Sequence, residues 1–151
     1  MLVVLSSSRA DISPVDGVGL QNEKGDSHML NEKIKEILGK EGAATFATAG
    51  TDGPHLAATW NSYITVLETD ELLIPVGGLH ETEENIKRNN NIQMIVASKE
   101  VNGTHGPGAG YILKGPVKFE RLGGYFDQVK AHFPWARAVM IFQPVDVKQL
   151  I

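Results

Sequence analysis

Apolar side chains recur along this chain at two spacings, which predict helices in some stretches and strands in others. From Met29 onward they fall three or four positions apart, with Ile34 and Leu38 on one face, and this spacing predicts a short amphipathic helix. A glycine, Gly39 or Gly42, supplies its end. The predicted helices cover residues 30–38, 80–91 and 125–133.

Stretches rich in Val, Ile, Thr and aromatic residues predict strands between these helices. Six are expected, over residues 43–50, 55–68, 71–76, 92–99, 109–120 and 136–145. Turn sequences such as Thr51-Asp52-Gly53-Pro54 join most of them, and alternating βαβ units are missing. The predicted fold is therefore mainly β, an antiparallel barrel of five or six strands with peripheral helices.

Residues 1–28 differ from the rest of the chain. They are rich in Ser, Gly and Asp, and after the first five residues they show no hydrophobic period. We therefore expect one domain over residues 29–151, preceded by an N-terminal arm over residues 1–28. The arm is either a natural extension or sequence from an expression vector, because Ser27-His28-Met29 resembles a vector junction.

Composition narrows the possible functions. With 151 residues, 42% of them hydrophobic and 21% charged, the chain suits one compact domain. A formal charge of -4 with scattered Lys and Arg predicts no nucleic-acid partner. The apolar start, Met1 to Leu5, is too short for a signal peptide or a membrane span, so a soluble, cytoplasmic protein is expected. Because cysteine is absent, thiolate chemistry is excluded, and electron transfer would need an organic cofactor.

The second predicted strand carries candidate binding residues. Trp60 lies between Thr59 and Asn61, and Tyr63 follows three positions later. Such a strand can place an aromatic ring against a flat ligand while its polar neighbours bond the edge of that ligand. The alternative is a tryptophan that packs in the core.

A glycine pair and a helix start follow the third predicted strand. Gly77 and Gly78 let backbone amides approach a ligand, and Thr82 offers a hydroxyl at the positive end of the next helix. An ordinary hairpin and an ordinary capped helix would use the same residues. Together with the strand around Trp60, these residues predict a site for a flat ring that ends in a phosphate, such as flavin mononucleotide (FMN).

Other chemistry has less support in the sequence. The five histidines are widely spaced and form no metal-ligand motif, so no metal site is predicted. Ser62 lacks the G-x-S-x-G elbow of many serine hydrolases, and no catalytic residue is predicted.

Five segments after the arm occur together and in order. They are DGPHLAATWNSY at 52–63, PVGGLH at 75–80, ENIKR at 84–88, NGTHGPGAGYILKG at 102–115 and FPWARA at 133–138. In these segments the chain resembles the small bacterial FMN-binding proteins of the pyridoxamine 5'-phosphate oxidase-like split-barrel superfamily. The resemblance implies a six-stranded antiparallel split β-barrel, and usually a homodimer with FMN near the subunit interface.

The resemblance also implies which residues bind the cofactor. Those expected along the ring system are Thr59, Trp60, Asn61, Tyr63 and Trp135. The ring and the ribityl chain are expected to lie along the backbone of Val76, Gly77 and Gly78. The phosphate is expected at Thr82.

One position departs from that family. Where the small FMN-binding proteins carry lysine after the histidine, this chain has Glu81. A carboxylate repels phosphate, so either another cation, such as Lys87 or Arg88, compensates or the affinity for FMN falls.

Three functions are compatible with these expectations. The first is an FMN-bearing electron-transfer protein with an unknown redox partner. The second is an oxidoreductase, either an oxidase like pyridoxamine-phosphate oxidase or a flavin reductase. The third is a cofactor-free interaction module on the same barrel, an alternative that Glu81 keeps open. The later strands lack the basic cluster that a second phosphate pocket would need, which favours electron transfer over the oxidase.

Overall fold

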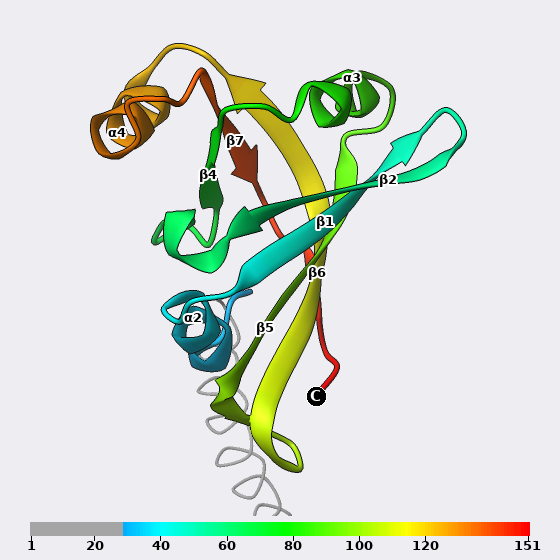
Figure 1. The fold of residues 1–151 in the computed structure, drawn as a ribbon, viewed down its shortest axis with the longest axis vertical. Helices are drawn as coiled ribbons and strands as arrows, with labels where there is room; N and C mark the ends of the chain where they lie inside the picture. The colour runs from blue at the N-terminus through cyan, green and yellow to red at the C-terminus, as the bar shows by residue number, and fades with distance from the viewer. Residues whose placement is uncertain (1–28) are drawn as a thin grey trace, which may run out of the picture.

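The structure, a computed structural model, describes residues 29–151 (Figure 1), and the predictions for residues 1–28 lie outside the described residues. The helices are α2 (Glu32–Leu38), the 3-10 turn η2 (Asn61–Tyr63), α3 (His80–Arg88) and α4 (Gly124–His132). The strands are β1 (Ala43–Gly50), β2 (Gly53–Trp60), β3 (Thr65–Val66), β4 (Leu72–Val76), β5 (Asn91–Gly103), β6 (Gly106–Glu120), β7 (Ala138–Phe142) and β8 (Asp146–Gln149). None of these helices is long and apolar enough to cross a membrane.

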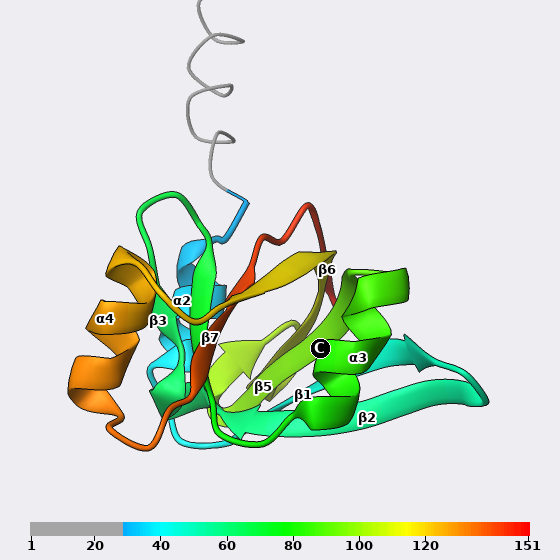
Figure 2. The same cartoon turned by 90° about the horizontal axis from the view of Figure 1, so that it is seen from above.

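The strands pair antiparallel in one curved arrangement. Their order is β2-β1-β5-β6-β7-β4-β3, and β8 pairs with β6. Strand β6 joins the two halves, because its earlier part pairs with β5 and β8 while residues 117–120 pair with β7. Viewed from above, the strands surround a common interior, with α3 and α4 at its periphery (Figure 2).

The mainly β, antiparallel fold expected from the sequence is confirmed, but the strands number eight among the described residues rather than six. The predicted strand over residues 55–68 is interrupted after Trp60. There the backbone N–H of Asn61 donates to the carbonyl oxygen of Gly42 (2.8 Å), and its side-chain Nδ2 donates to that of Ile37 (3.4 Å). These bonds turn the chain toward α2, so only the two residues of β3 resume the strand. The other additional strand is β8.

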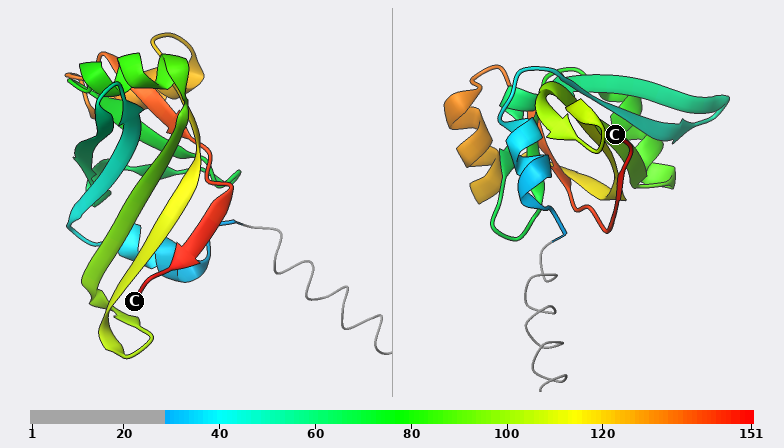
Figure 3. Two further views of the ribbon diagram at one scale, coloured as in Figure 1. Left: turned by 90° about the vertical axis from the view of Figure 1, so that its right-hand side faces the viewer. Right: turned by 90° about the horizontal axis from the view of Figure 1, so that it is seen from below.

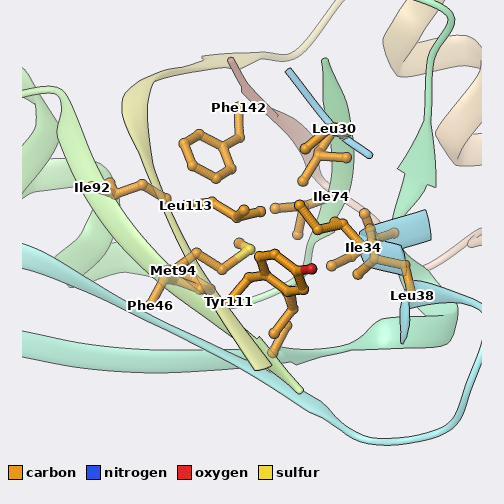
Figure 4. Close-up of a cluster of buried hydrophobic side chains, with 14 of the residues drawn as sticks. Leu30, Ile34, Leu38, Phe46, Ile74, Ile92, Met94, Tyr111, Leu113 and Phe142 are labelled. Carbon is orange, nitrogen blue, oxygen red and sulfur yellow. The ribbon is translucent and has the colours of Figure 1, made fainter. Parts of the chain in front are cut away.

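The core fills the space between the two halves of the sheet and α2. Helix α2 is capped by Asn31, whose Oδ1 accepts a hydrogen bond from the N–H of Ile34 (2.9 Å). Ile34 and its neighbours on that face pack into the same interior as the strands' inward side chains (Figure 4). The largest fully buried side chains include Phe46, Met94, Leu113 and Phe142. Each such burial stabilises the fold by roughly 1.5–3 kcal/mol.

The opposite side of β2, β1, β5 and β6 forms an outward face that the described helices leave exposed. Strand registers align two rows of side chains across it, Ala58-Thr45-Ile95-Ile112 and Leu56-Ala47-Gln93-Lys114. Leu56 is 68% exposed and Ile95 is 44% exposed. Figure 3 shows β5, β6 and β8 side by side along this part of the molecule. Such an apolar sheet surface is typical of a contact with another molecule.

Candidate functional site

A hollow of about 290 Å³ lies where β2 ends, between the turn after β4 and the turn before β7. Its lining residues are Ala58, Thr59, Trp60, Tyr63, Pro75, Gly77, Gly78, Leu79 and Trp135. Six of the predicted site residues are thus brought together there, namely Thr59, Trp60, Tyr63, Gly77, Gly78 and Trp135. Trp60 and Trp135 are 52% and 51% exposed, which is unusual for the largest apolar side chain.

An aromatic cluster supports Trp135 from one side. The Tyr63 ring lies 5.7 Å from the ring of Trp135 and 5.0 Å from that of Phe133, between ring centres, and Phe133 lies 5.6 Å from Trp135. Tilted pairs at these distances stabilise by about 0.5–1.5 kcal/mol each. The cluster therefore fixes the indole of Trp135 while leaving half of its surface open.

Gly77 lies directly beneath this indole. A Cβ at position 77 would lie 3.1 Å from Cε3 of Trp135, closer than an ordinary van der Waals contact. A Cβ at Gly78 would meet nothing within 4 Å. The first glycine therefore makes room for the Trp135 ring, and the second leaves space in the hollow.

Helix α3 begins beside the hollow, and its N-cap residue, Leu79, has the left-handed backbone conformation with φ 59° and ψ 32°. For a residue other than glycine this conformation costs roughly 1–2 kcal/mol. The first intrahelical bond runs from the N–H of Glu83 to the carbonyl oxygen of Leu79 (3.0 Å). The N–H groups of His80, Glu81 and Thr82 precede it and are donors without a helical partner, as at any helix N-terminus. Such groups suit an anion.

Thr82 is fully buried in the first turn of α3. Its hydroxyl has no hydrogen-bond partner among residues 29–151. An unsatisfied buried hydroxyl costs roughly 1–3 kcal/mol, a cost that a hydrogen bond to a ligand at the first turn would remove.

The charged side chains of α3 are not arranged as expected if Lys87 or Arg88 compensated for Glu81. Lys87 pairs with Glu84, and Arg88 donates from Nη2 to Oδ1 of Asn85 (3.0 Å). Both cations lie in the last turn, about 8–9 Å along the helix axis from Thr82.

In the first turn Glu81 contacts His55, with 3.3 Å between Oε1 and Nδ1. Lys87 and Arg88 are therefore engaged at the opposite end of α3 from Glu81.

Two arginines instead meet the first turn of α3 at Glu83. Arg137 donates from Nη1 to Oε1 of Glu83 (3.0 Å), and Arg121 bonds the other carboxylate oxygen, Oε2. Burial raises the pKa of the Glu83 carboxyl, but the hydrogen bonds and charges of Arg121 and Arg137 outweigh it and hold that pKa below its ordinary value of 4.5. Glu83 is thus a carboxylate at neutral pH.

Three predicted site residues do not line the hollow. Asn61 is fully buried and directs its amide toward the end of α2. Val76 is buried at the end of β4, immediately before the glycine pair, and Thr82 lies in the following helix.

Two residues at or next to the hollow, Leu79 and Arg137, were not predicted as site residues. Leu79 gives no sequence signal for a left-handed backbone, whereas Arg137 falls within the FPWARA segment that carried part of the resemblance.

A larger groove of about 600 Å³ lies elsewhere, on the outward face near the β1–β2 hairpin. Its lining residues include Ala47, Gly53, Asn91, Gln93 and Lys114, and none of the predicted site residues. It lacks the aromatic walls of the smaller hollow, so the smaller hollow is the better candidate for a flat ring.

Comparisons with known proteins identify relatives of this chain. A relative from Nitratidesulfovibrio vulgaris, named FMN-binding protein, is 41% identical over 123 residues, which are 82% of this chain and 100% of the relative. The structure of an FMN-binding protein from Syntrophomonas wolfei has a TM-score of 0.65 at 14% identity and covers 91% of this chain and 97% of its own. That of the Group A Streptococcus protein HupZ has a TM-score of 0.67 at 18% identity and covers 81% of this chain and 94% of its own.

The two structures share the fold of this chain. Residues 30–150 also match the family model described as Pyridoxamine 5'-phosphate oxidase. The family expected from the five sequence segments is confirmed: this chain belongs to the pyridoxamine 5'-phosphate oxidase family.

Proposed function

We propose that this chain is a flavoprotein that binds FMN in the hollow between Trp60 and Trp135 and takes part in electron transfer. The observation that carries the proposal is the hollow itself, where two half-exposed tryptophans stand beside a glycine pair that leads into a helix N-terminus. Its family and the relative named FMN-binding protein support FMN as the ligand.

The residues around the hollow fit the ring end of FMN. Trp60, Trp135 and Tyr63 offer flat apolar surfaces, and at Gly78 no side chain blocks the approach of a ligand to the backbone. An apolar pocket with a few placed polar groups is the usual form of a cofactor site.

The start of α3 fits the phosphate end. The N–H groups of His80, Glu81 and Thr82 and the unpartnered hydroxyl of Thr82 can donate to phosphate oxygens. The carboxylate of Glu81 opposes binding there, so neutral donors and the helix dipole carry most of the attraction.

FMN, when bound, supplies a ring system that accepts and returns electrons. The protein positions that ring and adjusts how readily it is reduced. Backbone N–H groups at Gly78 and Leu79 would stabilise negative charge on the reduced ring, whereas the negative charge of Glu81 would oppose it. No side chain of this chain is required as a nucleophile.

Electron transfer is preferred over oxidation of a phosphorylated substrate for one reason. A substrate such as pyridoxine 5'-phosphate needs cations for a second phosphate, and the two arginines at the first turn of α3, Arg121 and Arg137, are both engaged by Glu83. Anaerobic mixing of the oxidised, FMN-loaded protein with NADH, NADPH or pyridoxine 5'-phosphate separates the two. We expect little bleaching over minutes, and rapid bleaching by any one of them would favour the oxidoreductase.

The proposal includes a homodimer formed through the outward face. Its two cross-strand rows are rich in apolar and small side chains, and Trp60 follows Ala58 and Leu56 along the exposed side of β2. Because Trp60 also lines the hollow, a second copy on this face would lie next to the cofactor. This supports FMN near the subunit interface.

Titration of the ligand-free protein with FMN and with riboflavin tests the proposal. We expect FMN to bind, with loss of flavin emission beside the tryptophans, and riboflavin to bind roughly tenfold more weakly because it lacks the phosphate. Thr82→Val should weaken FMN and leave riboflavin unchanged, while Thr82→Ser retains FMN affinity. If the protein binds neither flavin, the proposal fails and a cofactor-free interaction module becomes the better account.

A further inference from the structure

Arg137 bonds three consecutive carbonyl groups at the turn after β4. Its backbone N–H donates to Val76 (2.8 Å), its Nε to Gly77 (2.8 Å) and its Nη2 to Gly78 (2.6 Å). Along an extended strand successive carbonyls point to alternate sides. Their convergence on one residue therefore requires a specific turn conformation at Gly77 and Gly78.

This arrangement determines where the N–H groups of the turn point. No cis peptide bond occurs among the described residues, and in a trans peptide group the C=O and N–H point in opposite directions. The carbonyls of Gly77 and Gly78 share their peptide groups with the N–H groups of Gly78 and Leu79. Because these carbonyls accept hydrogen bonds from Arg137, the two N–H groups face away from Arg137. The residues of the turn line the hollow, whereas Arg137 does not.

The guanidinium is itself held in place. Its third nitrogen, Nη1, donates to Glu83 (3.0 Å), which also binds Arg121. Glu83 belongs to α3, so Arg137 connects the glycine turn to the helix that starts just after it. The planar fork of an arginine can make these bonds in fixed directions, which the single ammonium of a lysine cannot.

We propose that Arg137 is a positioning residue for the cofactor: from behind the turn it orients the N–H groups of Gly78 and Leu79 toward the hollow. The inference rests on the proposed FMN site. Arg137 does not line that site and acts only through the backbone that it binds.

Arg137→Lys tests the inference, with Arg121→Lys as its matched control. Both changes keep the positive charge near Glu83, but only the first removes the guanidinium bonds to the carbonyls of Gly77 and Gly78. We expect Arg137→Lys to raise the Kd for FMN about tenfold, a loss of about 1.4 kcal/mol, and Arg121→Lys to change it less than about twofold.

Backbone NMR of the ligand-free proteins measures the rigidity of the turn. A change in overall stability alone would not alter this rigidity. In the wild type and Arg121→Lys, the order parameters of Gly78 and Leu79 should lie near the rigid value of about 0.85, and in Arg137→Lys they should fall toward about 0.6. In the wild type the Nε–H signal of Arg137 should exchange slowly with water, a measurement that stands even if the variant fails to fold.

The outcomes separate this inference from the proposed function. A wild type that binds no FMN overturns both. FMN binding by Arg137→Lys with wild-type affinity and a rigid turn overturns only the inference, as does an equal loss in Arg121→Lys. Rapid exchange of the Arg137 Nε–H in the wild type overturns it too.

Discussion

Gly77 and Gly78 are adjacent glycines with different surroundings, and each has its own consequence for the site. Position 77 faces the indole of Trp135, and position 78 faces open space. The structure thus assigns a packing role to the first glycine and an access role to the second.

Replacing each glycine by alanine distinguishes these roles. Gly77→Ala should displace Trp135 and destabilise the ligand-free protein by about 1 kcal/mol, because overpacking forces the ring to move. Gly78→Ala should leave stability within about 0.5 kcal/mol, since its Cβ meets no atom. We nevertheless expect Gly78→Ala to weaken FMN severalfold. Thermal unfolding and FMN titration check both, and wild-type FMN affinity in Gly78→Ala would contradict the placement of the ligand over the turn.

Glu81 opposes the proposed phosphate site from the first turn of α3. Glu81→Lys changes the charge there by two units, and at exposed positions such a change is worth about 1 kcal/mol. We expect FMN to bind roughly fivefold more tightly at low salt, with the gain shrinking as salt screens it. Riboflavin affinity, which involves no phosphate, is the control. An unchanged FMN affinity at low salt would show that the phosphate lies away from α3.

At the scale of elements, Glu83 of α3 forms ion pairs with Arg137, the residue just before β7, and Arg121, the residue just after β6. A carboxyl whose pKa is lower in the folded than in the unfolded chain stabilises the fold above the unfolded pKa. That stabilisation is lost as the pH falls through the lowered folded pKa.

The stability difference between the wild type and Glu83→Gln should therefore depend on pH. At pH 7 the variant should melt below the wild type. The difference should persist down to about pH 4.5, the ordinary value for Glu83, and shrink at lower pH as the wild-type carboxyl is protonated. Melting curves from pH 7 to pH 3 measure it. A difference that stays constant to pH 3 would contradict the role of the ion pairs.

Elements with a clear hydrophobic period could be predicted from the sequence, and their interruptions could not. The alternation of buried and exposed residues in β1 and β5 matches the expected strands. The break after Trp60 depends on bonds from Asn61 to Gly42 and Ile37, residues that become neighbours only after folding.

The candidate site also has residues that could be predicted from the sequence and residues that could not. Trp60, Gly77 and Trp135 could be predicted as a group because they lie in segments that resemble known proteins. The contacts of Arg137 depend on the pairing of β4 with β7, which joins residues about sixty positions apart in the chain. The left-handed Leu79 has no local signal either, because leucine rarely adopts that conformation.

At the scale of the whole molecule, the outward face and the hollow meet at Trp60. A second copy on this face would bury the exposed apolar rows and border the cofactor. A dimer of this kind would explain why the domain leaves Leu56, Ile95 and Trp60 exposed.

Ile95→Glu tests the dimer, because it places a charge in the middle of one cross-strand row. Sedimentation should show the wild type at twice the mass of one chain and Ile95→Glu mainly as a monomer with weakened FMN binding. Leu122→Glu is the control, since Leu122 is 84% exposed and lies outside the outward face. A monomeric wild type, or equal dissociation of both variants, would contradict the proposed interface.

A crystal structure of the chain grown with FMN tests the central claim most directly. The account predicts flavin density in the hollow against Trp60 and Trp135, with the phosphate within hydrogen-bond distance of Thr82 and the first N–H groups of α3. Flavin density in the larger groove beside Lys114, with the hollow filled only by water, would contradict it.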